Sequence, residues 1–261
     1  MTALGEIKRF LLDMDGTVYL GNELIDGADL FLETIKKKGK QFIFITNNSS
    51  KNRGDYVEKL NRLGVFVTAD DIFTSGEAAA IVLNKIKPRA KIFLLGTEAL
   101  RMDLTDSGFE TINSGSPDFV LLGFDTTLTY EKLWRACDHI RGGVPYYATH
   151  PDLNCPLENG KYMPDAGAMI AFIKAATGKT PVVIGKPNRR FVGAAAKKYG
   201  LIKNETAIIG DRLYTDIKTG LNCGITSVLV LSGETDEKMA ASSKIKSDYV
   251  FESVKDIIKF I

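Results

Sequence analysis

Two aspartates near the start of the chain, Asp13 and Asp15, directly follow an apolar stretch and precede Gly16. A glycine lets the backbone turn sharply where a strand ends. From such a turn Asp13 could act on a ligand as a nucleophile, and Asp15 could give a proton to the leaving oxygen and later take one back. Aspartates at such positions also cap helices or line turns without doing chemistry. The pair by itself leaves both interpretations open.

Thr46 ends the next strong apolar run and begins a polar loop that continues through Asn47 and Asn48. Its hydroxyl and the backbone N–H groups of the two asparagines could bind the oxygens of a phosphate. A threonine at this place can equally be an ordinary helix N-cap. Thr46 is therefore a candidate phosphate ligand only if the fold brings other charged groups close to it.

Three charged residues in the last third of the chain offer further chemistry. Lys186 lies between Gly185 and Pro187, where its ammonium could balance the charge of a phosphate or could simply be solvated. Asp211 follows an apolar run and suits a hard cation that prefers oxygen ligands, while Asp216 suits a supporting place outside the coordination sphere. The alternative is a helix with Asp211 as its N-cap and Asp216 in its first turn.

Strands and helices must alternate to bring these residues together. Apolar runs of strand length alternate with amphipathic patterns of helical length, for example at 28–38, which predicts an α/β protein with parallel sheets. The predicted strands are 10–12, 41–45, 92–95, 119–122, 146–148, 182–184, 207–209 and 227–231. Ligands bind beyond the carboxyl ends of strands in such sheets. We assign the strands before all four polar groups to one sheet, so these groups should meet in one pocket.

The strands of the middle third form a group of their own. We predict a core of residues 1–77 and 180–261 that is interrupted by an inserted, smaller α/β domain at 78–179.

Charge and cysteine content exclude several classes of function. The chain of 261 residues has a formal net charge of +2 and no long basic run, which argues against a nucleic acid polymer as partner. Cys137, Cys155 and Cys223 are widely spaced and odd in number, so they predict neither a disulfide framework nor a zinc site. Neither a secretory leader nor an apolar stretch of membrane-spanning length is apparent. We therefore expect a cytoplasmic protein with no membrane partner.

The order of the polar groups resembles the haloacid dehalogenase (HAD) superfamily over essentially the whole chain. Segment 13–17, Asp-Met-Asp-Gly-Thr, matches the first motif of that family and Thr46 the second. Lys186 matches the third motif, and Asp211 with Asp216 the fourth.

The insertion between the second and third motifs resembles the C2-type cap of this superfamily. Segments 13–20 and 46–50 resemble the NagD or 4-nitrophenylphosphatase branch. The resemblance implies a Rossmannoid parallel-sheet core with an inserted C2-type cap domain that determines substrate specificity.

The same resemblance implies Mg²⁺ as cofactor. The metal would be held by the carboxylate of Asp13, the main-chain oxygen of Asp15 and Asp211, with Asp216 outside these ligands. Mg²⁺ prefers one or two carboxylates together with waters and substrate phosphate, which agrees with this set. The phosphate ligands that the resemblance implies are Thr46, Asn47 and Lys186.

The activity implied is hydrolysis of small phosphomonoesters of the nucleotide, sugar phosphate or 4-nitrophenyl phosphate type. It would run through an aspartyl-phosphate intermediate on Asp13. Asp15 favours a phosphatase over a dehalogenase, because a poor alkoxide leaving group needs a proton donor and a halide does not.

Two loops of the insertion, 148–152 and 164–168, could form rims over the core pocket and select the substrate. The candidate substrate contacts there are His150, Asp152 and Asp165. In relatives the first loop often reads Thr-Asn-Pro-Asp, so His150 departs from the family pattern. The alternative for His150 is a loop histidine with a structural hydrogen bond.

Two other functions share these features. A phosphomutase or other phosphotransferase would use the same aspartyl-phosphate but pass the phosphoryl group to an acceptor other than water. A non-catalytic sensor would bind a phosphorylated metabolite without turning it over. In each case the partner is a small phosphorylated metabolite, and a homodimer is compatible with the sequence.

Overall fold

The chain forms two compact units in a computed structural model that describes residues 2–156 and 161–261. The first unit comprises Met1–Thr46, Arg53–Phe73 and Lys186–Ile261, and the second comprises Asn47–Asn52 and Thr74–Gly185. The short segment Asn47–Asn52, which directly follows Thr46, therefore belongs to the second unit.

The first unit is built on a six-stranded sheet with the order β15-β14-β13-β1-β4-β5. β1 pairs in parallel with β13 and β4, and β14 pairs in parallel with β13 and β15. The strands are β1 (Arg9–Leu12), β4 (Gln41–Thr46), β5 (Ile72–Thr74), β13 (Thr206–Gly210), β14 (Thr226–Val230) and β15 (Tyr249–Phe251). A short antiparallel pair, β2 (Tyr19–Leu20) and β3 (Glu23–Leu24), follows β1. The predicted parallel α/β core is confirmed.

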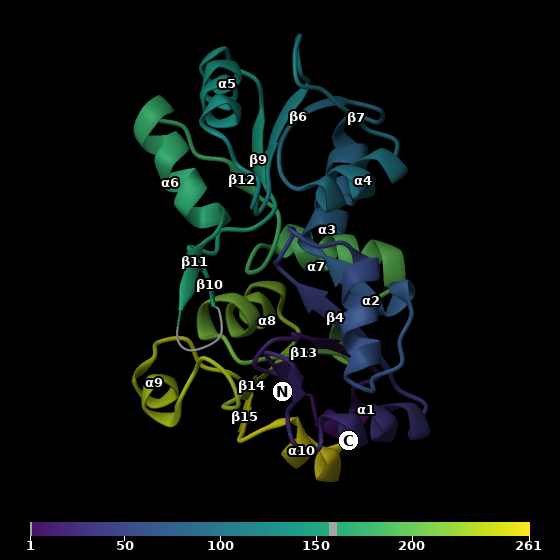
Figure 1. The fold of residues 1–261 in the computed structure, drawn as a ribbon. Helices are drawn as coiled ribbons and strands as arrows, with labels where there is room; N and C mark the ends of the chain where they lie inside the picture. Colours follow the sequence, from purple (N-terminus) through teal and green to yellow (C-terminus); the bar gives the residue numbers. More distant parts are fainter. Residues whose placement is uncertain (1, 157–160) are drawn as a thin grey trace. The chain divides into compact units, whose positions relative to one another are not determined.

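Helices cover both faces of this sheet, with α1 and α10 on one side and α7 and α8 on the other (Figure 1). The helices of the unit are α1 (Ala28–Lys37), α2 (Arg53–Arg62), α7 (Arg189–Tyr199), α8 (Lys218–Cys223), α9 (Glu237–Ser242) and α10 (Val254–Ile257), and Leu213–Ile217 is a π-helical turn. On one face Phe10 of β1 packs edge-on against Phe31 of α1, with ring centroids 6.2 Å apart. On the other, Gly220 lets α8 approach Ile208 of β13 closely.

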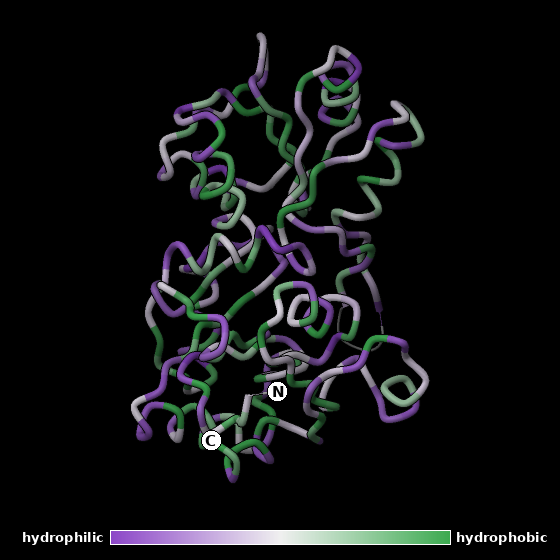
Figure 2. The backbone as a smooth tube through the Cα atoms, turned by 180° about the vertical axis from the view of Figure 1, so that it is seen from behind, coloured by the Kyte–Doolittle hydropathy of each residue, from purple (hydrophilic) through white to green (hydrophobic). Residues whose placement is uncertain are grey.

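Helix α1 shows how the sequence forms these elements. Its buried residues, Ala28, Phe31, Leu32 and Ile35, recur every three or four positions and so share one side of the helix. In Figure 2 hydrophobic and hydrophilic stretches alternate around the helical turns. The helix ends before Gly39, whose φ of 69° is a conformation that glycine adopts without strain.

The second unit has a five-stranded sheet with the order β12-β9-β8-β6-β7. Its strands are β6 (Lys91–Leu95), β7 (Glu110–Thr111), β8 (Phe119–Leu122), β9 (Tyr146–Ala148) and β12 (Val182–Val183). Its helices are α3 (Ser75–Ile86), α4 (Glu98–Asp106), α5 (Tyr130–Arg141) and α6 (Ala166–Thr177). Figure 1 shows α5 and α6 on one side of this sheet and α3 and α4 on the other. Antiparallel strands β10 (Asn154–Pro156) and β11 (Tyr162–Pro164) complete the unit.

Packing within the second unit follows the same rule of apolar contact between layers. Val120 of β8, Leu133 of α5 and Ile173 of α6 belong to one buried apolar cluster. Leu100 of α4 lies against Gly123, just beyond the end of β8. Over the residues that the structure describes, no helix is both long and apolar enough to cross a bilayer.

One strand belongs to a different sheet from the one predicted. Val182–Val183 pairs in parallel with β9 of the second sheet, so the prediction that all four polar groups follow strands of one sheet is wrong for Lys186. The physical reason is that a short apolar run is equally suited to either sheet, and its neighbours in space decide which one it joins.

Candidate active site

Asp13 extends β1 by one residue at the carboxyl end of the strand. Its backbone N–H donates to the carbonyl of Ile209 at 2.9 Å, which continues the ladder between β1 and β13. The chain then turns at Gly16, where φ is 81°, and the N–H of Gly16 donates to the carbonyl of Tyr19 at 2.8 Å. The side chain of Asp13 keeps 14% of its exposure, and Asp15 is exposed. The turn therefore leaves Asp15 accessible from solvent, whereas the carboxylate of Asp13 is largely buried.

Lys186 is a buried cation between two carboxylates. Its Nζ lies 2.6 Å from Oδ1 of Asp13 and 2.6 Å from Oδ1 of Asp216. Burial by itself would lower the pKa of Lys186, but the charges of Asp13 and Asp216 outweigh it and raise the pKa above its usual value. Lys186 therefore remains an ammonium group and sets the place of the Asp13 oxygen.

Asp211 follows β13 and has one oxygen bonded and one oxygen unsatisfied. Its Oδ2 accepts the backbone N–H of Glu234 at 2.7 Å. Its Oδ1 is buried and has no hydrogen-bond partner among the described residues. Burial, and then the negative charges of Asp13 and Asp216, raise the pKa of Asp211 to about 8. A buried oxygen without a donor is costly unless something outside the protein chain satisfies it.

Two glycines make room for the Asp211 carboxylate. A Cβ on Gly16 or on Gly233 would overlap with Oδ2 of Asp211. The two loops are also bound to each other, because the hydroxyl of Ser232 donates to the carbonyl of Gly16 at 2.8 Å. Backbone therefore surrounds Asp211 closely and fixes its position.

The three carboxylates form a donor set that fits a hard divalent cation. Oxygens of Asp13, Asp211 and Asp216 lie within 4.8 Å of one another. Oδ1 of Asp216 accepts from Lys186 and its Oδ2 accepts the N–H of Arg212 at 3.3 Å, whereas Oδ1 of Asp211 has no such donor in the described part of the chain. Asp13 and Asp211 are thus better placed than Asp216 to ligate a cation such as Mg²⁺.

Burial raises the pKa of Asp13 to about 6, with the attraction of Lys186 opposing the shift and the repulsion of Asp216 adding to it. The attraction of Lys186 thus offsets only part of the cost of placing the negative charge of Asp13 in a poorly solvated site. A divalent cation at Asp13 and Asp211 would reduce this cost.

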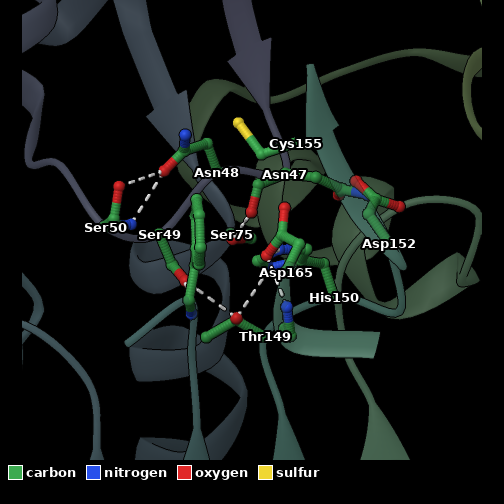
Figure 3. Close-up of polar contacts among 12 residues, drawn as sticks. Asn47, Asn48, Ser49, Ser50, Ser75, Thr149, His150, Asp152, Cys155 and Asp165 are labelled. Atoms are coloured by element: carbon green, nitrogen blue, oxygen red, sulfur yellow. Dashed lines mark hydrogen bonds and ion pairs between the residues drawn. The ribbon is translucent and has the colours of Figure 1, made fainter. Parts of the chain in front are cut away.

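Thr46 ends β4 as a buried residue, and the side chain of the next residue is already engaged. The amide nitrogen of Asn47 donates to both carboxylate oxygens of Asp152, at 3.2 and 3.1 Å, and its backbone carbonyl accepts from the hydroxyl of Ser75 (Figure 3). The predicted role of Asn47 in phosphate binding therefore falls to its backbone N–H. Asp152 thus accepts hydrogen bonds from the side chain of Asn47 in this arrangement.

His150 is fully buried and uses both ring nitrogens inside the protein. Nδ1 lies 2.8 Å from the hydroxyl of Thr149, and Nε2 lies 2.8 Å from Oδ1 of Asp165 (Figure 3). Asp165 is buried as well and caps α6 by accepting the N–H of Ala166 at 2.5 Å. This geometry favours the structural hydrogen bond over a substrate contact for His150 and Asp165.

The structure thus brings together Asp13, Lys186, Asp211 and Asp216 within the first unit. Sequence reasoning missed Gly233, whose backbone borders Asp211. The signal was available, because a Ser-Gly pair follows the predicted strand 227–231 just as polar residues follow the other strands.

Family comparisons agree with the order of these groups. A family described as haloacid dehalogenase-like hydrolase matches residues 10–110, and a family described as HAD-hydrolase-like matches residues 183–257. The first range contains Asp13, and the second contains Lys186 and Asp211.

Individual relatives match over nearly the full length. An acid sugar phosphatase from Staphylococcus aureus is 33% identical over 253 residues, which is 97% of each chain. A 4-nitrophenylphosphatase from Thermotoga maritima is 48% identical, with a TM-score of 0.94 and 98% of each chain covered. A glycerol phosphate phosphatase from Mycobacterium tuberculosis, solved in complex with magnesium, is 29% identical with a TM-score of 0.90, covering 99% of this chain and 79% of that one.

Proposed function

The chain belongs to the haloacid dehalogenase-like hydrolases and is a phosphatase, and we propose that it hydrolyses small phosphomonoesters through a phosphoryl group carried on Asp13. The observation that carries this proposal is the buried Lys186 between Asp13 and Asp216, beside the unsatisfied oxygen of Asp211. Such a site combines a carboxylate in a fixed position, which can attack phosphorus, with a positive charge that can balance the charge of the phosphate. Sugar phosphates are the first substrate class to examine, since a relative is an acid sugar phosphatase.

Asp13 and Asp15 divide the chemistry between them. A carboxylate oxygen of Asp13 attacks phosphorus, the bond from phosphorus to the ester oxygen breaks, and Asp15 gives its proton to the departing alkoxide. Asp15 then takes a proton from water, whose oxygen attacks phosphorus and releases phosphate from Asp13. The exposure of Asp15 is compatible with this exchange of protons with substrate and water.

The carboxylates of Asp13 and Asp211, with the main-chain oxygen of Asp15, would hold Mg²⁺. When bound, the cation supplies positive charge that lets an anionic carboxylate approach an anionic phosphate. Lys186 supplies a second positive charge, and Asp216 keeps Lys186 in place at 2.6 Å. Thr46 and the backbone N–H groups of Asn47 and Asn48 would bind phosphate oxygens.

The proposal is tested by measuring phosphate release from sugar phosphates, nucleoside monophosphates and 4-nitrophenyl phosphate, with Mg²⁺ and with EDTA. We expect release that depends on Mg²⁺ and returns when Mg²⁺ is added back in excess of the chelator. Transfer of the phosphoryl group to an alcohol acceptor with no free phosphate would indicate a phosphotransferase instead. Binding of these esters without any turnover would indicate a sensor.

Asp15→Asn should affect poor leaving groups more than good ones. We expect the first chemical step to slow by roughly 10²- to 10⁴-fold with a sugar phosphate, the usual range for loss of a general acid. With 4-nitrophenyl phosphate that step should slow much less, because nitrophenolate leaves without a proton. Rapid-mixing experiments should then show a burst of nitrophenolate followed by slow release of phosphate. Equal slowing of the first step with both esters would contradict the proton-donor role.

A further inference from the structure

A run of buried hydrogen bonds in the second unit extends from Ser49 to Asp165 (Figure 3). The hydroxyl oxygen of Ser49 accepts the N–H of Phe124 at 2.9 Å and lies 2.9 Å from the hydroxyl of Thr149. That hydroxyl lies 2.8 Å from Nδ1 of His150, whose Nε2 lies 2.8 Å from Asp165. One arrangement satisfies every member: Ser49 donates to Thr149, Thr149 to Nδ1, and Nε2–H to the carboxylate.

The first end of this network holds the segment that follows Thr46. Within that segment Ser49 is bound by Thr149, and the amide of Asn47 is bound by Asp152 at 3.1 and 3.2 Å. The hydroxyl of Ser75 donates to the backbone carbonyl of Asn47 as well. The backbone directly after Thr46 is therefore fixed by side chains of the second unit.

The turn Thr149–His150 also contacts Gly185, the residue before Lys186. The N–H of Gly185 donates to the carbonyl of Thr149 at 2.6 Å. A Cβ on Gly185 would overlap with that carbonyl and would lie 3.2 Å from Cβ of His150. Only glycine lets the two backbones come this close.

From these contacts we propose that the turn Thr149–His150, fixed by Asp165, positions both chain segments that lead into the phosphate-binding residues Thr46 and Lys186. The proposal rests on the phosphatase function proposed above. Thr149 and His150 are positioning residues, because their polar side-chain atoms are used within the network and not on the substrate. His150 then affects the affinity for phosphate although it does not touch phosphate.

Positioning predicts a change in phosphate affinity that exceeds the change in the chemical step. In Thr149→Val the shape of the side chain is kept and the hydroxyl is lost. We expect KM for a sugar phosphate and the inhibition constant of inorganic phosphate to rise together by about 10-fold, which corresponds to a loss of about 1.4 kcal/mol of binding free energy. We expect kcat to fall much less.

Three further variants separate positioning from loss of stability. Thr149→Ser keeps the hydroxyl and should restore both constants to their wild-type values. In His150→Asn the side chain is too short to span from Thr149 to Asp165, so both constants should lie between those of wild type and Thr149→Val. Thr177→Val is the matched control, because it removes a hydroxyl that bonds the carbonyl of Ile173 at 2.7 Å outside the network. It should leave phosphate inhibition unchanged.

Gly185→Ala tests the other segment without removing any hydrogen-bonding group. We expect it to weaken inhibition by phosphate, whereas Gly193→Ala should not, because a Cβ on Gly193 meets nothing within 4 Å. The proposal is overturned if Thr149→Val and Gly185→Ala both bind phosphate as wild type does, or if Thr149→Ser is as defective as Thr149→Val. Either result alongside active wild type and inactive Asp13→Asn would leave the phosphatase assignment standing. No phosphate release by wild type would overturn the assignment itself.

Discussion

Replacing Asp13 by asparagine should abolish phosphate release while leaving the fold at least as stable as wild type. The amide is a poor nucleophile, so we expect kcat to fall by at least about a thousand-fold, as when other catalytic nucleophiles are removed. Stability should not fall, because burial makes the charged form of Asp13 costly and raises its pKa to about 6 in spite of the attraction of Lys186. Lys186 keeps its bond to Asp216 in the variant.

Two measurements make this prediction specific. Unfolding by urea in EDTA compares the free energy of unfolding of the variant with that of wild type. Mass spectrometry after acid quench should find one phosphoryl group on the wild-type peptide that carries Asp13, and none on the variant. Asp26→Asn is the control, since Asp26 is an exposed residue that pairs only with Lys255 in the described ion pairs and such a pair contributes little. Undiminished turnover by Asp13→Asn would refute the assignment of Asp13 as nucleophile.

Replacing Lys186 by methionine should remove both activity and stability. The side chain is 2% exposed and bonds Asp13 and Asp216, so its loss leaves two buried carboxylates without their cation. Removal of one partner of a buried ion pair typically costs about 3–5 kcal/mol. We expect a loss of this size in the free energy of unfolding measured in EDTA. Phosphate release should be lost as well, because the variant lacks a positive charge for the phosphate.

A double variant separates the two effects of Lys186. Lys186→Met combined with Asp216→Asn removes the uncompensated charge of Asp216 together with the cation. We expect it to recover a substantial part of the lost stability while remaining inactive. If Lys186→Met alone were as stable as wild type, the ion pairs of Lys186 with Asp13 and Asp216 would not contribute to the free energy of unfolding, although they are buried. If it were unstable but fully active, the proposed role in phosphate binding would be wrong.

Much of the core could be predicted because it depends on local pattern. The strands that contain Leu12, Ile45 and Ile209 are apolar runs bounded by polar or glycine residues, and the structure has strands there. Polar residues just past such strands lie at one edge of a parallel sheet, so the sequence by itself predicted that Asp13 and Asp211 lie in the same site. The spacing of charged residues at strand ends thus determined where chemistry could occur.

The tertiary structure decided which partners these residues have. Val182–Val183 joins the second sheet although Lys186, three residues later, binds Asp13 and Asp216 of the first unit. A two-residue strand contains too little pattern to specify its neighbour, which depends on packing between distant parts of the chain.

His150 shows the same limit for a single side chain. Its residue type fits a substrate contact or a structural bond equally well, and only the positions of Thr149 and Asp165 distinguish them. The sequence by itself determined the parallel α/β core and the charged residues at its strand ends, because both follow from periodicity along the chain. Sheet membership and hydrogen-bond partners were decided by the tertiary structure, because they depend on distances between residues far apart in sequence.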